Sequence, residues 1–261
     1  MGYVAGLDSG STSTKLVVMQ DEKIDRYYVV PTGGNSLRSA QKVLELWFEE
    51  ADKTEHDLQC LVATGYGREN IKLAIKTVSE ISCHAKGVHW LFPDCRVIID
   101  IGGQDFKVIK LDKEGRVLNF AMNDKCAAGT GRYLELMANI FQMDLDAFGL
   151  AAFSAGGSVE ITSVCTVFAE SEVINHVSRG TAENEIVAGI FNAVARRVYS
   201  LAKQHIADAK EIVFTGGVAK NQGMIEALAR ITGCEVKVGF NPQITGALGA
   251  AIFSHHINGG Q

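Results

Sequence analysis

The sequence predicts an α/β protein of two lobes that arose by internal duplication. A strand, a turn of small residues and a second strand occupy residues 6–18, and the same pattern returns at residues 99–109. Three positions match between the two segments: Asp8 with Asp100, Gly10 with Gly102, and Lys15 with Lys107. In both halves a strand and a helix follow. A length of 261 residues, at ~150 residues per domain, fits one large domain or two lobes.

We expect the first lobe to span residues 1–92 and to contain the Asp8 hairpin. The second lobe is expected over residues 93–245 with the Asp100 hairpin, and a closing helix over residues 246–261 is expected to return to the first lobe. Small residues from Gly246 onward would let this helix approach other backbone closely.

In the first half, residues 36–51 have the apolar spacing of an amphipathic helix, with Asn35 or Ser36 as its N-cap. A short strand is expected over residues 60–64, ended by a glycine turn. In the second half, helices are expected over residues 132–141 and 186–206. An apolar strand at residues 212–215 then runs into two glycines, as expected where a buried strand meets a ligand turn.

Composition places the chain among ordered globular proteins, since 47% of its residues are hydrophobic and 21% are charged. The net charge of −5 argues against a broad basic face for nucleic acid and leaves a nucleotide or protein partner open. The N-terminus lacks the apolar stretch of a signal peptide. The most apolar run, residues 244–253, is about half of the ~20 residues that a membrane span needs. We therefore expect a cytoplasmic protein without a membrane span.

Six cysteines in a reducing compartment are not expected to form structural disulfides. Cys126 lies in a glycine-bearing loop ahead of one expected helix, and Cys165 lies ahead of another helix with Ala169, Val173, Ile174 and Val177 on one face. Thiolates bind metals, and helix N-termini stabilise anions. Inert packing is the alternative for each of these two. The other four, Cys60, Cys83, Cys95 and Cys234, are expected to be core thiols.

A turn of Gly, Ser and Thr between two strands offers backbone N–H groups and hydroxyls to phosphate, whereas an acidic residue needs a cation to approach it. We therefore expect Asp8 and Asp100 to serve Mg²⁺ binding and hydrolysis, and Gln104 to orient the attacking water. The expected phosphate contacts are Ser11, Thr12, Ser13, Lys15, Gly102 and Gly103. The alternative is that both aspartates only fix tight turns.

Other nucleotide motifs are absent, because no stretch fits a P-loop and the two partial G-x-G-x-x-G matches lack the third glycine. Together with Thr215–Ala219, the two hairpins resemble the phosphate and adenosine segments of the actin, Hsp70 and sugar kinase superfamily. The resemblance implies a duplicated, RNase H-like two-lobed fold with the nucleotide in the interlobe cleft. Adenosine would be held by Gly216 and Gly217, and we add Lys220 and Gly246 to the nucleotide site.

Longer segments resemble one family within that superfamily, the ATP-dependent one-electron "archerase" activators of 2-hydroxyacyl-CoA dehydratases. They are residues 8–15, 64–68, 80–84, 99–105, 123–132, 165–173 and 215–218. The resemblance implies that Cys126 and Cys165 hold a four-iron four-sulfur cluster between two identical subunits. Residues 150–159 add nothing to this resemblance.

A homodimer also follows from the chemistry of the cluster, because a cubane takes four thiolates and two per chain supply four only across a twofold axis. The family resemblance further implies ferredoxin or flavodoxin as the electron donor. The acceptor would be a dehydratase, a benzoyl-CoA-type reductase or another double-cluster protein. Raising one electron by roughly 400 mV costs on the order of 10 kcal/mol, a scale that ATP hydrolysis can supply.

Three other functions fit parts of the pattern. A small-molecule kinase of the same superfamily would use Asp100 or Asp105 as its base but leaves the two cysteines unexplained. An actin-like or chaperone-like ATP switch would have no redox chemistry. A zinc-bridged dimer would use the same two thiolates.

Overall fold

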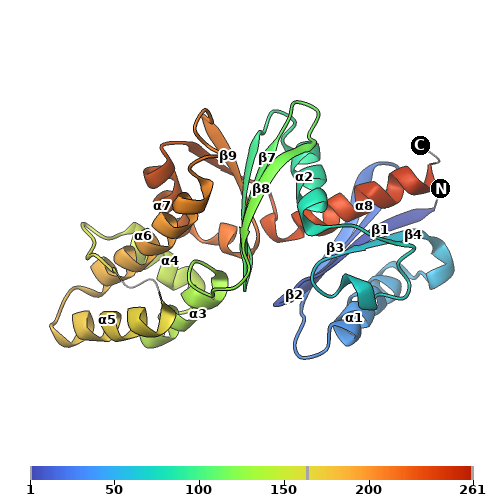
Figure 1. The fold of residues 1–261 in the computed structure, drawn as a ribbon. Coiled ribbons are helices and arrows are strands. Elements are labelled where there is room, and N and C mark those ends of the chain that lie inside the picture. The colour runs from blue at the N-terminus through green and yellow to red at the C-terminus, as the bar shows by residue number, and fades with distance from the viewer. Residues whose placement is uncertain (1, 163–164, 260–261) are drawn as a thin grey trace. The chain divides into compact units, whose positions relative to one another are not determined.

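The structure is a computed structural model that describes residues 2–162 and 165–259. The chain forms two compact units, each with its own core. The first comprises residues 1–95, 111–118 and 243–261, and the second comprises residues 96–110 and 119–242. Each unit is built on a five-stranded sheet (Figure 1).

The first sheet has the strand order β3-β2-β1-β4-β5. Its strands are β1 (Tyr3–Ser9), β2 (Ser13–Gln20), β3 (Lys23–Pro31), β4 (Leu58–Thr64) and β5 (Lys76–Thr77). The first three strands are antiparallel neighbours, whereas β4 pairs in parallel with both β1 and β5. The predicted strand at residues 60–64 is therefore confirmed, two residues longer at its start.

The second sheet has the order β10-β9-β6-β7-β8, which is the first order read from its other end. Its strands are β6 (Val97–Ile101), β7 (Phe106–Leu111), β8 (Val117–Asn123), β9 (Glu211–Thr215) and β10 (Glu235–Val238). Asp8 faces Lys15 in the first hairpin, and Asp100 faces Lys107 in the second. Both predicted hairpins are thus confirmed, and the shared register and strand order confirm the duplicated α/β fold.

Three helices belong to the first unit: α1 (Ser36–Ala51), α2 (Glu80–Leu91) and α8 (Thr245–Asn258). Helix α1 has the predicted bounds, and the side chain of its N-cap Asn35 accepts a hydrogen bond from the backbone of Arg38 at 3.0 Å. Helix α8 packs against β1, β4 and α2 (Figure 1). Gly6 on β1 and Gly249 on α8 make this packing close, since a Cβ on either would overlap facing backbone.

The second unit holds α3 (Gly131–Ile140), α4 (Leu145–Phe153), α5 (Thr166–Ser178), α6 (Glu183–Ala202) and α7 (Gln222–Thr232). Helix α6 packs against α4 and α7 (Figure 1), and Phe148, Phe191 and Phe214 are buried in the core. Short 3₁₀ helices cover Glu55–Asp57, Arg68–Asn70, Gly217–Lys220 and Pro242–Ile244.

Two helix predictions for the second unit need correction. Helix α6 ends at Ala202, because the backbone tightens into a turn where His205 donates to the carbonyl of Ala202 at 2.8 Å. Ile206 is nevertheless buried, which explains why its apolar spacing extended the prediction. On α5, Ala169 and Val173 are buried as an apolar face requires, whereas Ile174 and Val177 are 50% and 47% exposed.

Helices long and apolar enough to cross a membrane do not occur among the residues that the structure describes.

Candidate nucleotide and cysteine sites

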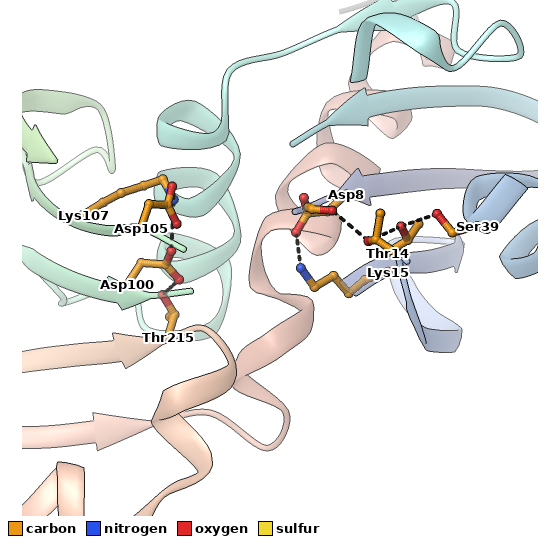
Figure 2. A network of polar contacts seen from close by, with 10 residues as sticks. Asp8, Thr14, Lys15, Ser39, Asp100, Asp105, Lys107 and Thr215 are labelled. Carbon is orange, nitrogen blue, oxygen red and sulfur yellow. Dashed lines mark hydrogen bonds and ion pairs between the residues drawn. The ribbon is translucent and has the colours of Figure 1, made fainter. Parts of the chain in front are cut away.

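The first candidate site is the turn between β1 and β2. The backbone N–H of Gly10 donates to the carbonyl of Ser13 at 3.2 Å, which closes the turn. Asp8, at the end of β1, is 7% exposed, and its Oδ2 accepts from Nζ of Lys15 at 3.0 Å (Figure 2). The ion pair follows from the strand register, which places these two residues opposite each other.

Buried hydroxyls anchor this turn from its inner side. Thr14 Oγ1 lies 2.9 Å from Thr32 Oγ1 and 2.9 Å from Ser39 Oγ, so it links β2 to β3 and α1. Thr32 Oγ1 in turn donates to the carbonyl of Gly10 at 2.8 Å. Ser11 and Thr12 are exposed at the tip. Their hydroxyls are therefore accessible to a ligand, while the hydrogen bonds of Thr14 and Thr32 hold the turn in place.

Space beside Asp8 is kept open by Gly246 at the start of α8. A Cβ on Gly246 would lie 3.3 Å from Oδ2 of Asp8 and 3.1 Å from Nε2 of His84. His84 is buried on α2, so an imidazole belongs to the surroundings of the carboxylate. From the sequence, His84 is part of a segment that resembles the family, but no local signal predicts that α2 lies next to β1.

The second candidate site is the turn between β6 and β7. Asp100 and Lys107 are both 3% exposed, with Lys107 Nζ 3.5 Å from Asp100 Oδ2 and 2.7 Å from Asp105 Oδ2 (Figure 2). Thr215 Oγ1 donates to Asp100 Oδ1 at 2.8 Å. Lys107 thus lies between two carboxylates, whose oxygens are the kind of ligand that Mg²⁺ prefers. Thr215 was not predicted as a partner of Asp100, because only the pairing of β6 with β9 brings the two residues together.

The carbonyls of this second turn are bonded to helix α3. Gly102 N–H donates to Asp105 O at 3.0 Å, and the carbonyls of Gly102 and Gly103 accept from the N–H groups of Gly131 and Arg132, each at 2.9 Å. These are the first two residues of α3, whose amides have no partner within the helix. Gln104 is exposed at the tip of the turn. A shift of the turn would therefore move the start of α3.

Gly216 brings the end of β9 against Asp100. Its φ is +89°, and a Cβ at this position would lie 3.0 Å from Asp100 Oδ1 and would overlap the carbonyl of Ile101. Its N–H donates to Pro242 O at 3.0 Å. Gly217 opens the 3₁₀ helix that ends at Lys220. The conformation and the close approach both require glycine at position 216.

Gly216→Ala is expected to lower the free energy of unfolding by about 2–5 kcal/mol, from a left-handed backbone and a steric overlap together. Gly180→Ala is the matched control, because Gly180 has φ +73° but no heavy atom within 4 Å of its virtual Cβ. The control should lose only about 1–2 kcal/mol. Urea denaturation of both variants measures the difference. Equal losses would contradict the close packing of Gly216 on Ile101.

The six cysteines separate into two groups. Cys60, Cys83, Cys95 and Cys234 are buried, as predicted for core thiols. Burial raises the pKa of the Cys83 thiol to about 12, and it also raises the pKa of Cys60, so both stay protonated at neutral pH. Cys126 is half-buried and Cys165 is exposed. These two are the thiols that a ligand can reach.

Both accessible cysteines precede helices of the second unit. Cys165 is the N-cap residue of α5, and Cys126 lies in the loop before Thr130, the N-cap of α3. Asn123 Nδ2 donates to the carbonyl of Cys126 at 2.8 Å. Groups of three or more His, Cys, Asp or Glu that could hold a metal are absent from the described residues.

Known proteins match this chain over nearly its whole length. The 2-hydroxyisocaproyl-CoA dehydratase activator of Clostridioides difficile is 46% identical over 252 residues, which cover 97% of this chain and 94% of the relative. The activator of lactoyl-CoA dehydratase of Anaerotignum propionicum is 47% identical over 254 residues and 97% of both chains.

Solved structures agree with these sequence matches. The structure of the Clostridium difficile activator with bound ADPNP superimposes with a TM-score of 0.93 at 46% identity, covering 99% of this chain and 96% of that one. A ROK hexokinase from Thermus thermophilus, 16% identical with a TM-score of 0.51 over 97% of this chain and 98% of that one, shares the fold alone. The predicted actin and sugar kinase fold class is thus confirmed. Residues 5–254 match the model of one family, and the chain belongs to the BadF/BadG/BcrA/BcrD ATPase family.

Proposed function

We propose that this ATPase activates a 2-hydroxyacyl-CoA dehydratase by using ATP hydrolysis to deliver one electron at low potential. The observation that carries the proposal is a full-length match to dehydratase activators in a chain whose two accessible thiols precede helices of one unit. Reduced ferredoxin or flavodoxin is the proposed donor. The electron passes to an iron–sulfur protein, and ATP is split into ADP and phosphate.

The two hairpins are proposed to bind the phosphates of MgATP. Asp8 and Asp100 are the proposed Mg²⁺ ligands, directly or through water, since Mg²⁺ prefers carboxylate oxygens and keeps several waters. The Ser11–Ser13 and Gly102–Gln104 turns, which are exposed at Ser11, Thr12 and Gln104, contribute hydroxyls and backbone N–H groups. Gln104 is proposed to orient the attacking water, and Gly216, Gly217 and Lys220 are proposed to hold adenosine.

The two accessible thiols fit a four-iron four-sulfur cluster shared by two chains. Such a cluster takes four thiolates, and Cys126 and Cys165 from each of two subunits supply that number. When bound, the cluster would accept and release one electron. The peptide dipoles at the start of α3 and α5 would favour negative charge near these residues. We therefore propose a homodimer whose cluster depends on both subunits.

A short chain of hydrogen bonds supports coupling between the nucleotide and the cysteines. The carbonyls of Gly102 and Gly103 hold the first amides of α3, and the carbonyl of Ala127 accepts from Thr130 N–H at 3.0 Å at the same helix start. Cys126 directly precedes Ala127. When the terminal phosphate leaves, a movement of the turn can shift α3 and the loop that carries Cys126. Such a shift would change the environment of the thiolates.

An anaerobic assay tests the proposed output. Reduced protein, MgATP and an iron–sulfur dehydratase are mixed under argon, and phosphate release, oxidation of the activator and reduction of the acceptor are followed together. We expect phosphate release to accompany acceptor reduction, and we expect no phosphorylated small molecule. Phosphate release without electron transfer to any dehydratase-type acceptor would contradict the coupling. A phosphorylated metabolite would instead identify a kinase.

A further inference from the structure

A cavity of about 510 Å³ lies within the second unit, beside the loop that carries Cys126. Its walls come from β7 (Phe106), β8 (Met122 and Asn123), α3 (Tyr133) and α6. The volume falls in the range of small-molecule sites, about 300–1,000 Å³. The proposed nucleotide-binding residues do not line it.

The charge of this cavity is positive. Two arginines on α6, Arg196 and Arg197, line it, and the described residues that line it include no Asp or Glu. Arg196 Nη2 donates to the carbonyl of Ile161 at 2.9 Å, which fixes that side chain at the wall. A ligand that enters therefore meets guanidinium groups without competing carboxylates.

The Nε atom of Arg197 is buried from solvent. Within residues 2–162 and 165–259 this nitrogen has no hydrogen-bond acceptor. Leaving a buried donor without a partner is unfavourable, and more so when the donor is charged. Gly129 leaves room for this side chain, since a Cβ on Gly129 would lie 3.2 Å from Cδ of Arg197 and 3.0 Å from the ring of Phe106. An anion in the cavity would give the buried Nε of Arg197 the acceptor that the described residues do not supply.

We propose that this cavity binds a small organic anion, with its carboxylate on Arg197 and its apolar body against Phe106 and Tyr133. Aromatic and aliphatic walls with a few polar groups are typical of sites for such ligands. Asn123 also lines the cavity and donates to the carbonyl of Cys126, so a bound ligand would touch the support of the cysteine loop. The site does not depend on the proposed electron transfer.

Calorimetric titration with acetate, butyrate and hexanoate tests the site, with hexanamide as the neutral control. Affinity is expected to rise about fourfold for each buried methylene, and hexanoate is expected to bind ~10-fold more tightly than hexanamide. Arg197→Met should remove the preference for the charged ligand. Arg179→Met, which changes an exposed arginine outside the cavity, should leave it unchanged.

A second variant keeps the test independent of the arginine. Ser200 lies at the exposed rim of the cavity, three and four residues after the two arginines, so Ser200→Glu places a competing carboxylate beside them. We expect this variant to fold and to lose hexanoate binding. Equal binding of hexanoate and hexanamide, or binding that both variants retain, would overturn the proposal. A dimer weakened by Arg197→Met in a protein that binds no hexanoate would also overturn it, because the occupant would then be a second copy.

Discussion

Asp8→Asn is expected to lower the rate of ATP hydrolysis by about 10²–10³-fold, the effect of removing one group that stabilises transition-state charge. Asp8 is a buried carboxylate with an ammonium at 3.0 Å, and a side chain at position 246 would crowd it. An amide of the same shape removes the charge that a magnesium ion needs and leaves Lys15 without its counter-ion. Phosphate release under saturating MgATP measures the loss.

Asp25→Asn is the control for this variant. Asp25 is exposed on β3 of the same sheet, and its carboxylate lies 3.9 Å from the guanidinium of Arg26. The Asp25→Asn variant should therefore hydrolyse ATP at the rate of the parent protein. Visible absorption should be unchanged in both variants, because the cysteines belong to the other unit. Parental turnover in Asp8→Asn would show that the aspartates of the two hairpins only close their turns.

Cys126→Ala and Cys165→Ala are each expected to remove nearly all iron from anaerobically purified protein. The parent protein should be a brown homodimer with one cluster per two chains, and each variant deletes two of the four thiolates that a cubane requires. Iron analysis and visible absorption measure the loss, and sedimentation shows whether the dimer depends on the cluster. Zinc in place of iron in the parent protein would point to a colourless zinc-bridged dimer instead.

Cys60→Ala and Cys234→Ala are the matched controls, because each removes one thiol that is buried in a core. Cys234 Sγ donates to the carbonyl of Ala209 at 3.2 Å, so its replacement costs some stability and no iron. A full iron content in Cys126→Ala would contradict the assignment. Iron loss in either control would show that a core thiol is the ligand.

Local patterns predicted the parts of the fold whose signals lie close together in the sequence. The Asp8 and Asp100 hairpins could be predicted because small turn residues and flanking apolar strands are adjacent. Helix α4 was not predicted. Its sequence is apolar on most sides, with Phe148 buried but Leu150 and Phe153 more than half exposed. The face of α4 that is buried is set by packing against α6 and α7, and the hydrophobic periodicity of the sequence does not predict it.

In the candidate site, too, contacts between residues close in sequence could be predicted and contacts between distant residues could not. The Asp8–Lys15 and Asp100–Lys107 pairs follow from hairpin register, which sequence spacing predicts. Thr215 reaches Asp100 across 115 residues of chain, and His84 approaches Asp8 only because α2 and α8 pack together. Such partners depend on tertiary packing. The buried thiols were separable from the accessible ones because four of the six occur in or beside apolar stretches.

The placement of α8 has a consequence for the order in which the protein is made. The helix covers β1 and β4, which a ribosome completes before it has synthesised any of the second unit. The second unit has its own core and is fully synthesised before α8. Until residues 245–258 emerge, Val4, Val17 and Val62 lack the apolar partners that bury them, and the nascent first unit exposes a hydrophobic sheet face. The first unit therefore cannot bury this sheet face until α8 has been synthesised. Shielding by a chaperone would matter most before that point.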